Sequence, residues 1–133
     1  MFRRLVYMML VGVVGACSTT THVTPSINHV VFIKLKDPVD ASRLMDDCDR
    51  LLPSIPGVHG YWCGQHGEYG RATVDGDYDV ALYVGFATAD GYATYVDHDN
   101  HVELVERWKP SFEWIRVHDV VDRNHATGSG YTE

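Results

Sequence analysis

Apolar and polar residues alternate along this chain in a pattern that predicts four strands and two helices. Residues 29–36 are apolar at both parities, with Val30 and Phe32 on one side and Val31, Ile33 and Leu35 on the other. Apolar residues at both parities indicate a strand covered on both faces, or a central strand of a sheet. Residues 40–52 instead carry apolar side chains at helical spacing, which predicts an amphipathic helix. Asp40 is a candidate N-cap for this helix, and Pro53 ends it.

The rest of the chain continues the alternation. Further strands are expected at 57–65, 79–86 and 112–121. Thr88 is a candidate N-cap for the second helix, whose apolar stripe contains Tyr92, Tyr95 and Val96. A further turn or helix is expected before Pro110. The polar, glycine-containing segment 66–76 between two strands predicts an exposed loop.

The order of these elements is β-α-β-β-α-β, which predicts an α+β, ferredoxin-like domain. Such a domain has a four-stranded antiparallel sheet with both helices on one face. The first and third strands carry apolar residues on both faces, so the face without helices needs a cover. Packing against the sheet of a second copy is the simplest cover, and we therefore expect a two-fold homodimer.

The N-terminus resembles a bacterial lipoprotein leader. Arg3 and Arg4 precede an apolar stretch at 5–14 that is too short to span a bilayer stably, and Val14-Gly15-Ala16-Cys17-Ser18 is similar to a lipobox. We expect residues 1–16 to be removed and Cys17 to be lipidated, with an ordinary signal peptide as the alternative. Ser18 then favours the periplasmic side of the outer membrane in a Gram-negative host. Residues 17–28 are expected to form a tether, and 122–133 a flexible tail.

Charge and cysteine content narrow the function classes. The formal net charge of the 133 residues is −7, and becomes −9 if Arg3 and Arg4 leave with the leader. Without a cluster of Lys or Arg, this acidic balance excludes nucleic acid as a partner. Cys48 and Cys63 would occupy an oxidising compartment after export, where a disulfide persists. Their alternative role is as two small residues of the core.

Candidate chemistry gathers around Tyr95, His98 and His101. Their spacing of three residues can bring neighbours to one side of a helix, and a phenol and a neutral imidazole can relay protons near pH 7. His101 could act as a general base, with Tyr95 orienting a carbonyl. Two alternatives are that His101 and His29 make only structural hydrogen bonds, or that they bind a ligand without turnover. Asp119 in the last strand is interpreted as a strand-end or network residue.

His98 and His101, with Asp97 or Asp99, could hold a divalent metal ion. A pair of histidines three residues apart is too common to indicate a metal site. We therefore predict no metal and no other cofactor.

Several segments, taken in order, resemble the stress-responsive α/β-barrel (Dabb) family. They are His29-Val30-Val31-Phe32 with Lys34, Leu52-Pro53-Ser54-Ile55-Pro56-Gly57-Val58, Asp77-Tyr78-Asp79-Val80-Ala81-Leu82, Phe86, Tyr95, His98-x-x-His101 and Asp119. The resemblance covers 29–121 and implies a dimeric α+β barrel. In a plant member that closes a polyketide ring, a Tyr/His pair matching Tyr95 and His101 carries the chemistry, and His29 and His98 match histidines of the same protein. The resemblance thus implies catalytic roles for His101 and Tyr95 and ligand-binding roles for His29 and His98.

Three functions follow as hypotheses. The first is a membrane-anchored homodimer that binds a small apolar or carbonyl ligand near Tyr95 and His101. The second is a cyclase or isomerase that uses these two residues for acid–base chemistry. The third is a structural or assembly role at the cell envelope. The leader argues against polyketide cyclisation, because it places the domain away from cytoplasmic thioesters.

Overall fold

A computed structural model describes residues 25–123 of the chain. Its elements, in order, are β1 (Ile27–Leu35), η1 (Pro38–Asp40), α1 (Ala41–Leu51), β2 (Val58–Gly64), β3 (Val80–Phe86), α2 (Ala89–Asp97), α3 (Asp99–Trp108), η2 (Lys109–Ser111) and β4 (Phe112–Val121). The predicted β-α-β-β-α-β order is confirmed, with the second helical region divided into α2 and α3. The predicted leader, Cys17, most of the tether and most of the tail lie outside the described residues.

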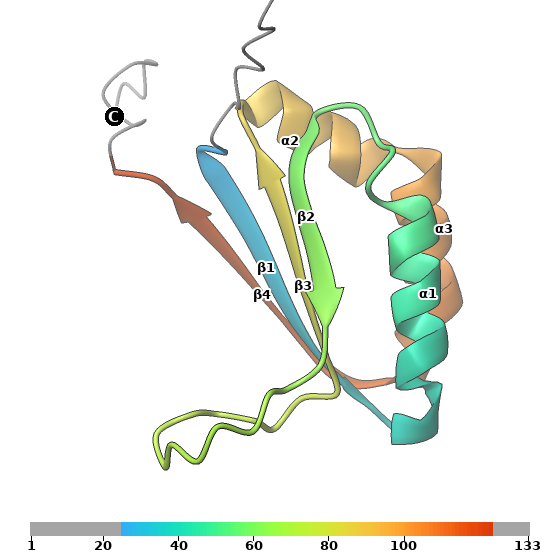
Figure 1. Ribbon diagram of the computed structural model, residues 1–133. Coiled ribbons are helices and arrows are strands. Elements are labelled where there is room, and N and C mark those ends of the chain that lie inside the picture. Colours follow the sequence, from blue (N-terminus) through green and yellow to red (C-terminus); the bar gives the residue numbers. More distant parts are fainter. Residues whose placement is uncertain (1–24, 124–133) are drawn as a thin grey trace, which may run out of the picture.

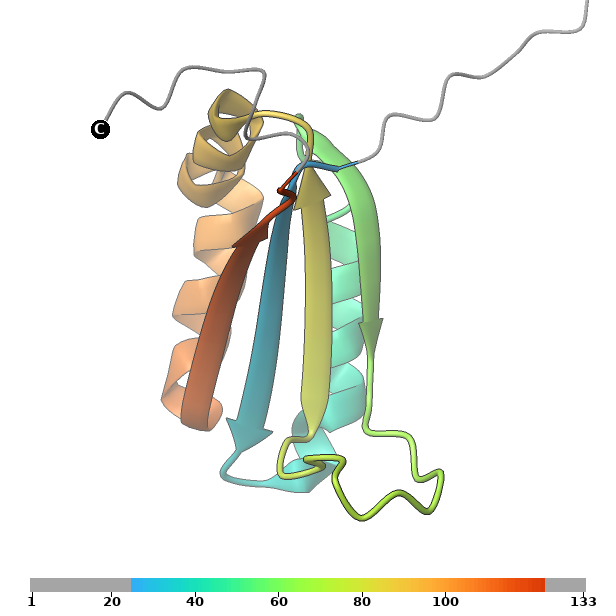
Figure 2. The ribbon, with the colours of Figure 1, turned by 90° about the vertical axis from the view of Figure 1, so that its left-hand side faces the viewer.

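The four strands form one antiparallel sheet in the order β2-β3-β1-β4. All three α-helices cover the same face of this sheet, and the opposite face is left open (Figures 1 and 2). β1 and β3 are the central strands, while β2 and β4 are the edges. This is the predicted ferredoxin-like arrangement.

The parity of β1 decides which of its side chains enter the core. Every second residue from Ile27 to Leu35 is buried against the helices, and the intervening residues are partly exposed on the open face. His29 is one of the buried positions, at 7% exposure. Its neighbours across the sheet are Val84 of β3 and Asp119 of β4. A histidine therefore sits inside an otherwise apolar row, where its polar atoms need partners.

The open face carries aromatic side chains that pack on one another. The rings of Trp62 and Tyr83 stack with centroids 5.7 Å apart, and Phe32 meets Tyr78 edge-on at 5.0 Å. Trp62 remains 50% exposed. Such exposed aromatic area on a sheet face is typical of a surface that a second protein covers.

The helix boundaries follow from local capping. The Thr88 side chain accepts a hydrogen bond from the Gly91 amide at 3.1 Å, which confirms it as the N-cap of α2. Asp40 occupies the N-cap position of α1, as predicted, but its side chain makes no capping hydrogen bond there. A 3-10 turn precedes α1, and Asp40 already has helical dihedrals there; Asp37 caps this turn instead by accepting from the Val39 amide at 3.1 Å.

Two glycines let α2 approach the loop before β2. Gly57 has a φ of +94°, a conformation that glycine adopts without strain. A Cβ atom at Gly57 would lie 2.7 Å from the Cα of Gly91. The two backbones are thus in direct contact, and neither position has room for a side chain without movement.

Candidate functional site

A pocket of about 290 Å³ lies between the helix-covered face of the sheet and helices α1, α2 and α3. Its lining is mostly apolar, with two histidines and two tyrosines among the lining residues: His29, Val31, Ile33, Leu44, Cys48, Leu82, Tyr92, Tyr95, Val96, His101, Leu104, Val105, Phe112, Ile115 and Val117. Ile115 and Val117 of β4 remain 48% and 49% exposed, so the pocket opens along this edge strand. An apolar cavity with a few convergent polar groups is the usual form of a small-molecule site.

His29 is held by a carboxylate on the neighbouring strand. Its Nδ1 lies 2.6 Å from Oδ1 of Asp119, its cross-strand neighbour, and the Tyr92 hydroxyl donates to Oδ2 of the same carboxylate at 2.9 Å. A carboxylate can only accept, so the proton of this bond is on Nδ1 and, in the neutral ring, the lone pair is on Nε2. Burial, and then the hydrogen bond to Asp119 and its charge, raise the pKa of Tyr92 to about 12, so Tyr92 stays protonated as the donor.

His101 is oriented in the same sense by the backbone. Its Nδ1 lies 2.9 Å from the carbonyl oxygen of Val96, which can only accept a hydrogen bond. Nδ1 therefore carries the proton, and Nε2 of the neutral ring keeps the lone pair. Burial lowers the pKa of His101 below 6.5, the bond to Val96 opposes this, and the nearby His29 adds to the lowering. His101 is thus a neutral base at pH 7.

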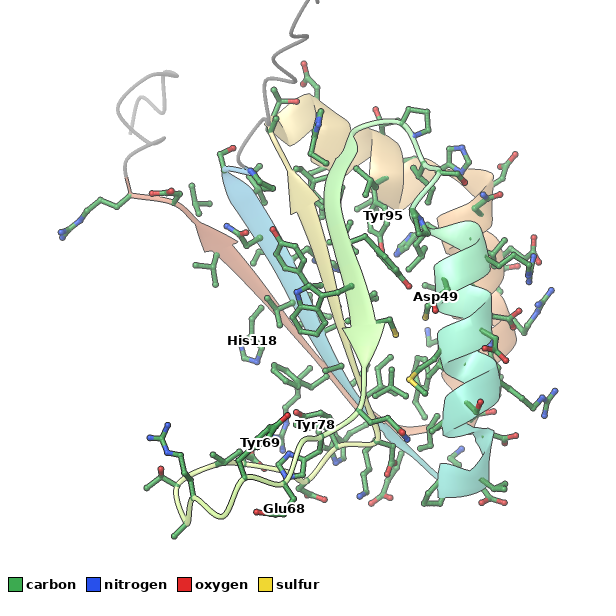
Figure 3. The ribbon with its side chains drawn as sticks, viewed as in Figure 1. Asp49, Glu68, Tyr69, Tyr78, Tyr95 and His118 are labelled. Carbon is green, nitrogen blue, oxygen red and sulfur yellow. The ribbon has the colours of Figure 1, made fainter. Side chains whose placement is uncertain are left out.

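Tyr95 lies between the two imidazoles. Its ring centroid is 4.5 Å from that of His101 and 5.9 Å from that of His29. The side chain is 1% exposed, and burial raises the pKa of its hydroxyl. Among residues 25–123 no hydrogen-bond partner holds this hydroxyl, so its proton is available to a molecule in the pocket. Figure 3 shows Tyr95 in the layer between sheet and helices.

The structure brings His29, Tyr95 and His101 together at one pocket and leaves His98 out of its lining. The helix is interrupted at His98, whose ψ of 139° is extended, and its Nδ1 accepts from the Asn100 amide at 3.1 Å. His98 is therefore the N-cap of α3. Tyr95 and His101 reach the same pocket because α2 and α3 pack against each other at this break. They do not lie on one continuous helix.

Two members of the site belong to the network around His29. The interpretation of Asp119 as a network residue is confirmed by its two hydrogen bonds. Tyr92 was assigned only to the apolar stripe, and its polar role was missed. The signal was its position three residues before Tyr95, which places both phenols on one helix face.

Chemically, the arrangement offers one phenol donor and two imidazoles among apolar walls. Such a set can orient a carbonyl or hydroxyl oxygen and can accept a proton from a bound molecule. In residues 25–123 no group of three or more His, Cys, Asp or Glu side chains is placed to hold a metal ion. None of the helices within this range is long and apolar enough to cross a membrane.

Comparison with known proteins gives the same fold. A family model described as "Stress responsive A/B Barrel Domain" matches residues 27–122. A Dabb family protein of Mesorhizobium loti with a ferredoxin-like fold is 28% identical, with a TM-score of 0.61, over 72% of this chain and 95% of the other.

Two further solved structures resemble the fold at lower identity. A dimeric ferredoxin-like protein of Thermobifida fusca is 22% identical, with a TM-score of 0.61, over 72% of this chain and 90% of its own. The hydroxynitrile lyase of Passiflora edulis is 18% identical, with a TM-score of 0.61, over 73% and 93%. None of the curated proteins is similar enough to match.

Proposed function

Because the chain belongs to the stress-responsive A/B barrel domain (Dabb) family, we propose that it is a homodimer that binds a small apolar molecule bearing a carbonyl or hydroxyl group. The observation that carries this proposal is the pocket itself, which is apolar except where His29, Tyr92, Tyr95 and His101 meet. The Tyr95 hydroxyl lacks a partner among the described residues. An oxygen atom on the ligand would satisfy it.

The size and chemistry of the pocket restrict the ligand. At about 290 Å³ the pocket lies near the lower end of the roughly 300–1,000 Å³ range of small-molecule sites. This suits a molecule with on the order of ten non-hydrogen atoms, such as an aromatic ketone or a short-chain aldehyde. No Lys or Arg lines the pocket, so a highly charged ligand such as a nucleotide is disfavoured.

Dimerisation is supported by two observations. The Thermobifida relative is a dimeric ferredoxin-like protein, and the open sheet face of this chain carries packed, half-exposed aromatics such as Trp62. The residues that line the pocket belong to the helices and to the opposite, helix-covered face of the sheet. A partner on the open face therefore leaves the pocket's walls in place. Measuring the mass by light scattering tests this part, and Trp62→Asp is expected to weaken the dimer.

The leader supports a lipid anchor at Cys17, and with it a place in the cell envelope, on the periplasmic side of the outer membrane. Residues 1–24 lie outside the described part of the chain, so this proposal rests on the sequence alone. Labelling of cells with a radioactive fatty acid is expected to mark the protein, and Cys17→Ser is expected to remove the label. A Cys17→Ser protein that remains labelled would contradict the anchor.

The binding proposal is tested by NMR on the fragment 18–133, which keeps every described residue. Amide and imidazole shifts are followed while aromatic ketones, aldehydes, fatty acids and divalent metals are added. Shifts from a ketone or aldehyde are expected at His29, Tyr95 and His101, and His101→Gln is expected to weaken them. His59→Gln is the matched control, because His59 is exposed on β2 and does not line the pocket. If no class of added compound shifts these signals, the binding proposal is wrong, and the structural or assembly role at the cell envelope becomes the favoured hypothesis.

An acid–base enzyme is the second candidate. It is favoured by the 2.6 Å bond between Asp119 and His29, which orients one imidazole, and by the neutral state of His101. His101 would accept a proton from the bound molecule while Tyr95 donates a hydrogen bond to its oxygen. One structural relative is named as a hydroxynitrile lyase. Turnover that is lost in both Tyr95→Phe and His101→Gln, with ligand binding retained, would favour the enzyme over the binding protein.

A further inference from the structure

Cys48 of α1 and Cys63 of β2 face each other across the helix–sheet interface. Cys48 is fully buried, and Cys63 is partly buried and packs against the core. The interaction between the two thiols is the largest influence on the pKa of each: it raises that of Cys48 and lowers that of Cys63. Cys63 therefore carries the more acidic thiol of the pair.

A second contact ties the same two segments together. The Tyr61 hydroxyl donates to Oδ1 of Asp49 at 2.6 Å. Tyr61 lies two residues before Cys63 on the same strand face, and Asp49 directly follows Cys48. Figure 3 shows Asp49 on the side of α1 that faces β2. The Tyr61–Asp49 hydrogen bond thus holds this part of α1 against this part of β2, directly beside the two cysteines.

We propose that Cys48 and Cys63 form an intramolecular disulfide bond by exchange with a small-molecule disulfide such as oxidised glutathione. An S–S bond of about 2.05 Å requires the two sulfurs to move closer together. β2 is an edge strand, paired on one side only, so it can make this adjustment more easily than a central strand could. The inference depends neither on the ligand of the pocket nor on the lipid anchor.

The disulfide forms in two successive thiol–disulfide exchange steps. The Cys63 thiol, partly exposed and the more acidic, loses its proton to solvent and attacks one sulfur of oxidised glutathione, releasing one glutathione thiolate. Cys48 then loses its proton to solvent and attacks the Cys63 sulfur of the mixed disulfide, releasing the second glutathione. The two protein thiols are oxidised to one disulfide, and one oxidised glutathione is reduced to two thiols.

The bond would join the end of α1 to β2 across the connecting turn that contains Gly57. Cys48 also lines the pocket, so oxidation would fix one part of the pocket wall to the edge strand. A cross-link over a loop of about 15 residues lowers the equilibrium constant of unfolding by about 100-fold in the chain-entropy account. The oxidised protein is therefore expected to unfold at higher urea concentration than the reduced protein of the same sequence.

The test uses the full chain in detergent micelles, with Cys17→Ser in every sample so that only Cys48 and Cys63 remain. The folded protein is equilibrated in glutathione buffers of increasing oxidised fraction. It is then unfolded in acid, alkylated and analysed by mass spectrometry. The expected product carries no alkyl group and no glutathione, and yields a Cys48–Cys63 cross-linked peptide on digestion.

Two single variants separate the steps. Cys48→Ser is expected to accumulate glutathione on Cys63, because the resolving thiol is absent. Cys63→Ser is expected to keep a free thiol, because Cys48 is buried. Two alkylated cysteines in the oxidising buffer, or a stable glutathione adduct in the protein that has both cysteines, would overturn the proposal. Comparing urea unfolding of the oxidised and reduced forms of one sequence provides a check that does not depend on how well a variant folds.

Discussion

Removing the Asp119 carboxylate tests whether it holds His29 in place inside the sheet. Asp119 accepts from His29 Nδ1 at 2.6 Å and from the Tyr92 hydroxyl at 2.9 Å. In Asp119→Ala both donors lose this acceptor. His29 is 7% exposed, so water cannot readily replace the lost partner. The Asp119 side chain is itself 42% exposed, so removing its charge recovers little desolvation energy.

The magnitude follows from these exposures. Leaving a buried donor unsatisfied costs about 1–3 kcal/mol, and a hydrogen bond to a charged group contributes about 1.5–3 kcal/mol. We expect Asp119→Ala to lower the free energy of unfolding by about 2 kcal/mol. Asp119→Asn keeps one acceptor oxygen and is expected to cost about 1 kcal/mol. For a domain of this size each kcal/mol corresponds to a fall of about 4–8 °C in Tm.

The assay is urea unfolding at pH 7, with Glu113→Ala as the matched control. Glu113 is an exposed carboxylate on the same strand that does not line the pocket, so its removal changes the net charge equally. A control within about 0.5 kcal/mol of wild type is expected for a surface site. If Asp119→Ala were as mild as Glu113→Ala, the network would not hold His29. Imidazole ¹⁵N shifts provide a second measure, since His29 is expected to lose its preference for the Nδ1–H tautomer.

Three further predictions concern the scaffold and the pH response. Gly57→Ala would place a Cβ 2.7 Å from a neighbouring backbone at a φ of +94°, and is expected to cost about 1–3 kcal/mol in urea unfolding, whereas Gly64→Ala, with open space around it, is the near-neutral control. The pKa of Asp47 is lowered from 3.8 to about 2, mainly by Arg50, so its stabilisation is present above pH 4 and is lost as the pH falls through 2. Asp47→Asn is expected to cost about 1 kcal/mol at pH 7, discounted because Arg50 is about half exposed, and this cost is expected to shrink in acid unfolding as the pH falls through 2. The pKa of His101 is lowered below 6.5, so as the pH falls the unfolded chain takes up this proton before the folded protein does, and wild type loses stability below pH 6.5. If His101→Gln lost as much free energy of unfolding as wild type between pH 7 and pH 5, this account would be contradicted.

Much of the fold could be predicted from periodicity, because each element repeats its signal over many residues. The alternation in β1 and the helical spacing of α1 identified these elements. The sequence did not show which alternate residues of β1 face the core, because both the odd-numbered and the even-numbered residues of this strand include apolar side chains. Asp40 was placed correctly at the N-cap position of α1, but the short 3-10 turn before it has no periodic signal, so the capping hydrogen bond that Asp37 makes to this turn was not foreseen.

The site was predictable in part. Tyr95 and His101 were found because they lie close together in the sequence, and His29 because the family resemblance includes it. The hydrogen bonds from His29 and Tyr92 to Asp119 depend on the register between β1 and β4, which no local pattern encodes. For the same reason, the sequence left open whether Cys48 lies near Cys63. Long-range pairings of this kind come from packing, and not from spacing along the chain.

The most direct test of the central claim compares two probes of nearly equal shape, acetophenone and isopropylbenzene, by their Kd for the fragment 18–133. They differ where a carbonyl oxygen replaces a methyl group. The two probes also differ in hydrophobicity, so the quantity compared is the ratio of their Kd values in wild type and in Tyr95→Phe. If the Tyr95 hydroxyl is the unpaired donor in the pocket, Tyr95→Phe is expected to weaken acetophenone relative to isopropylbenzene about 2- to 13-fold, as one hydrogen bond contributes about 0.5–1.5 kcal/mol. A Kd ratio that is the same in wild type and Tyr95→Phe would contradict the assignment of this pocket as a carbonyl-binding site.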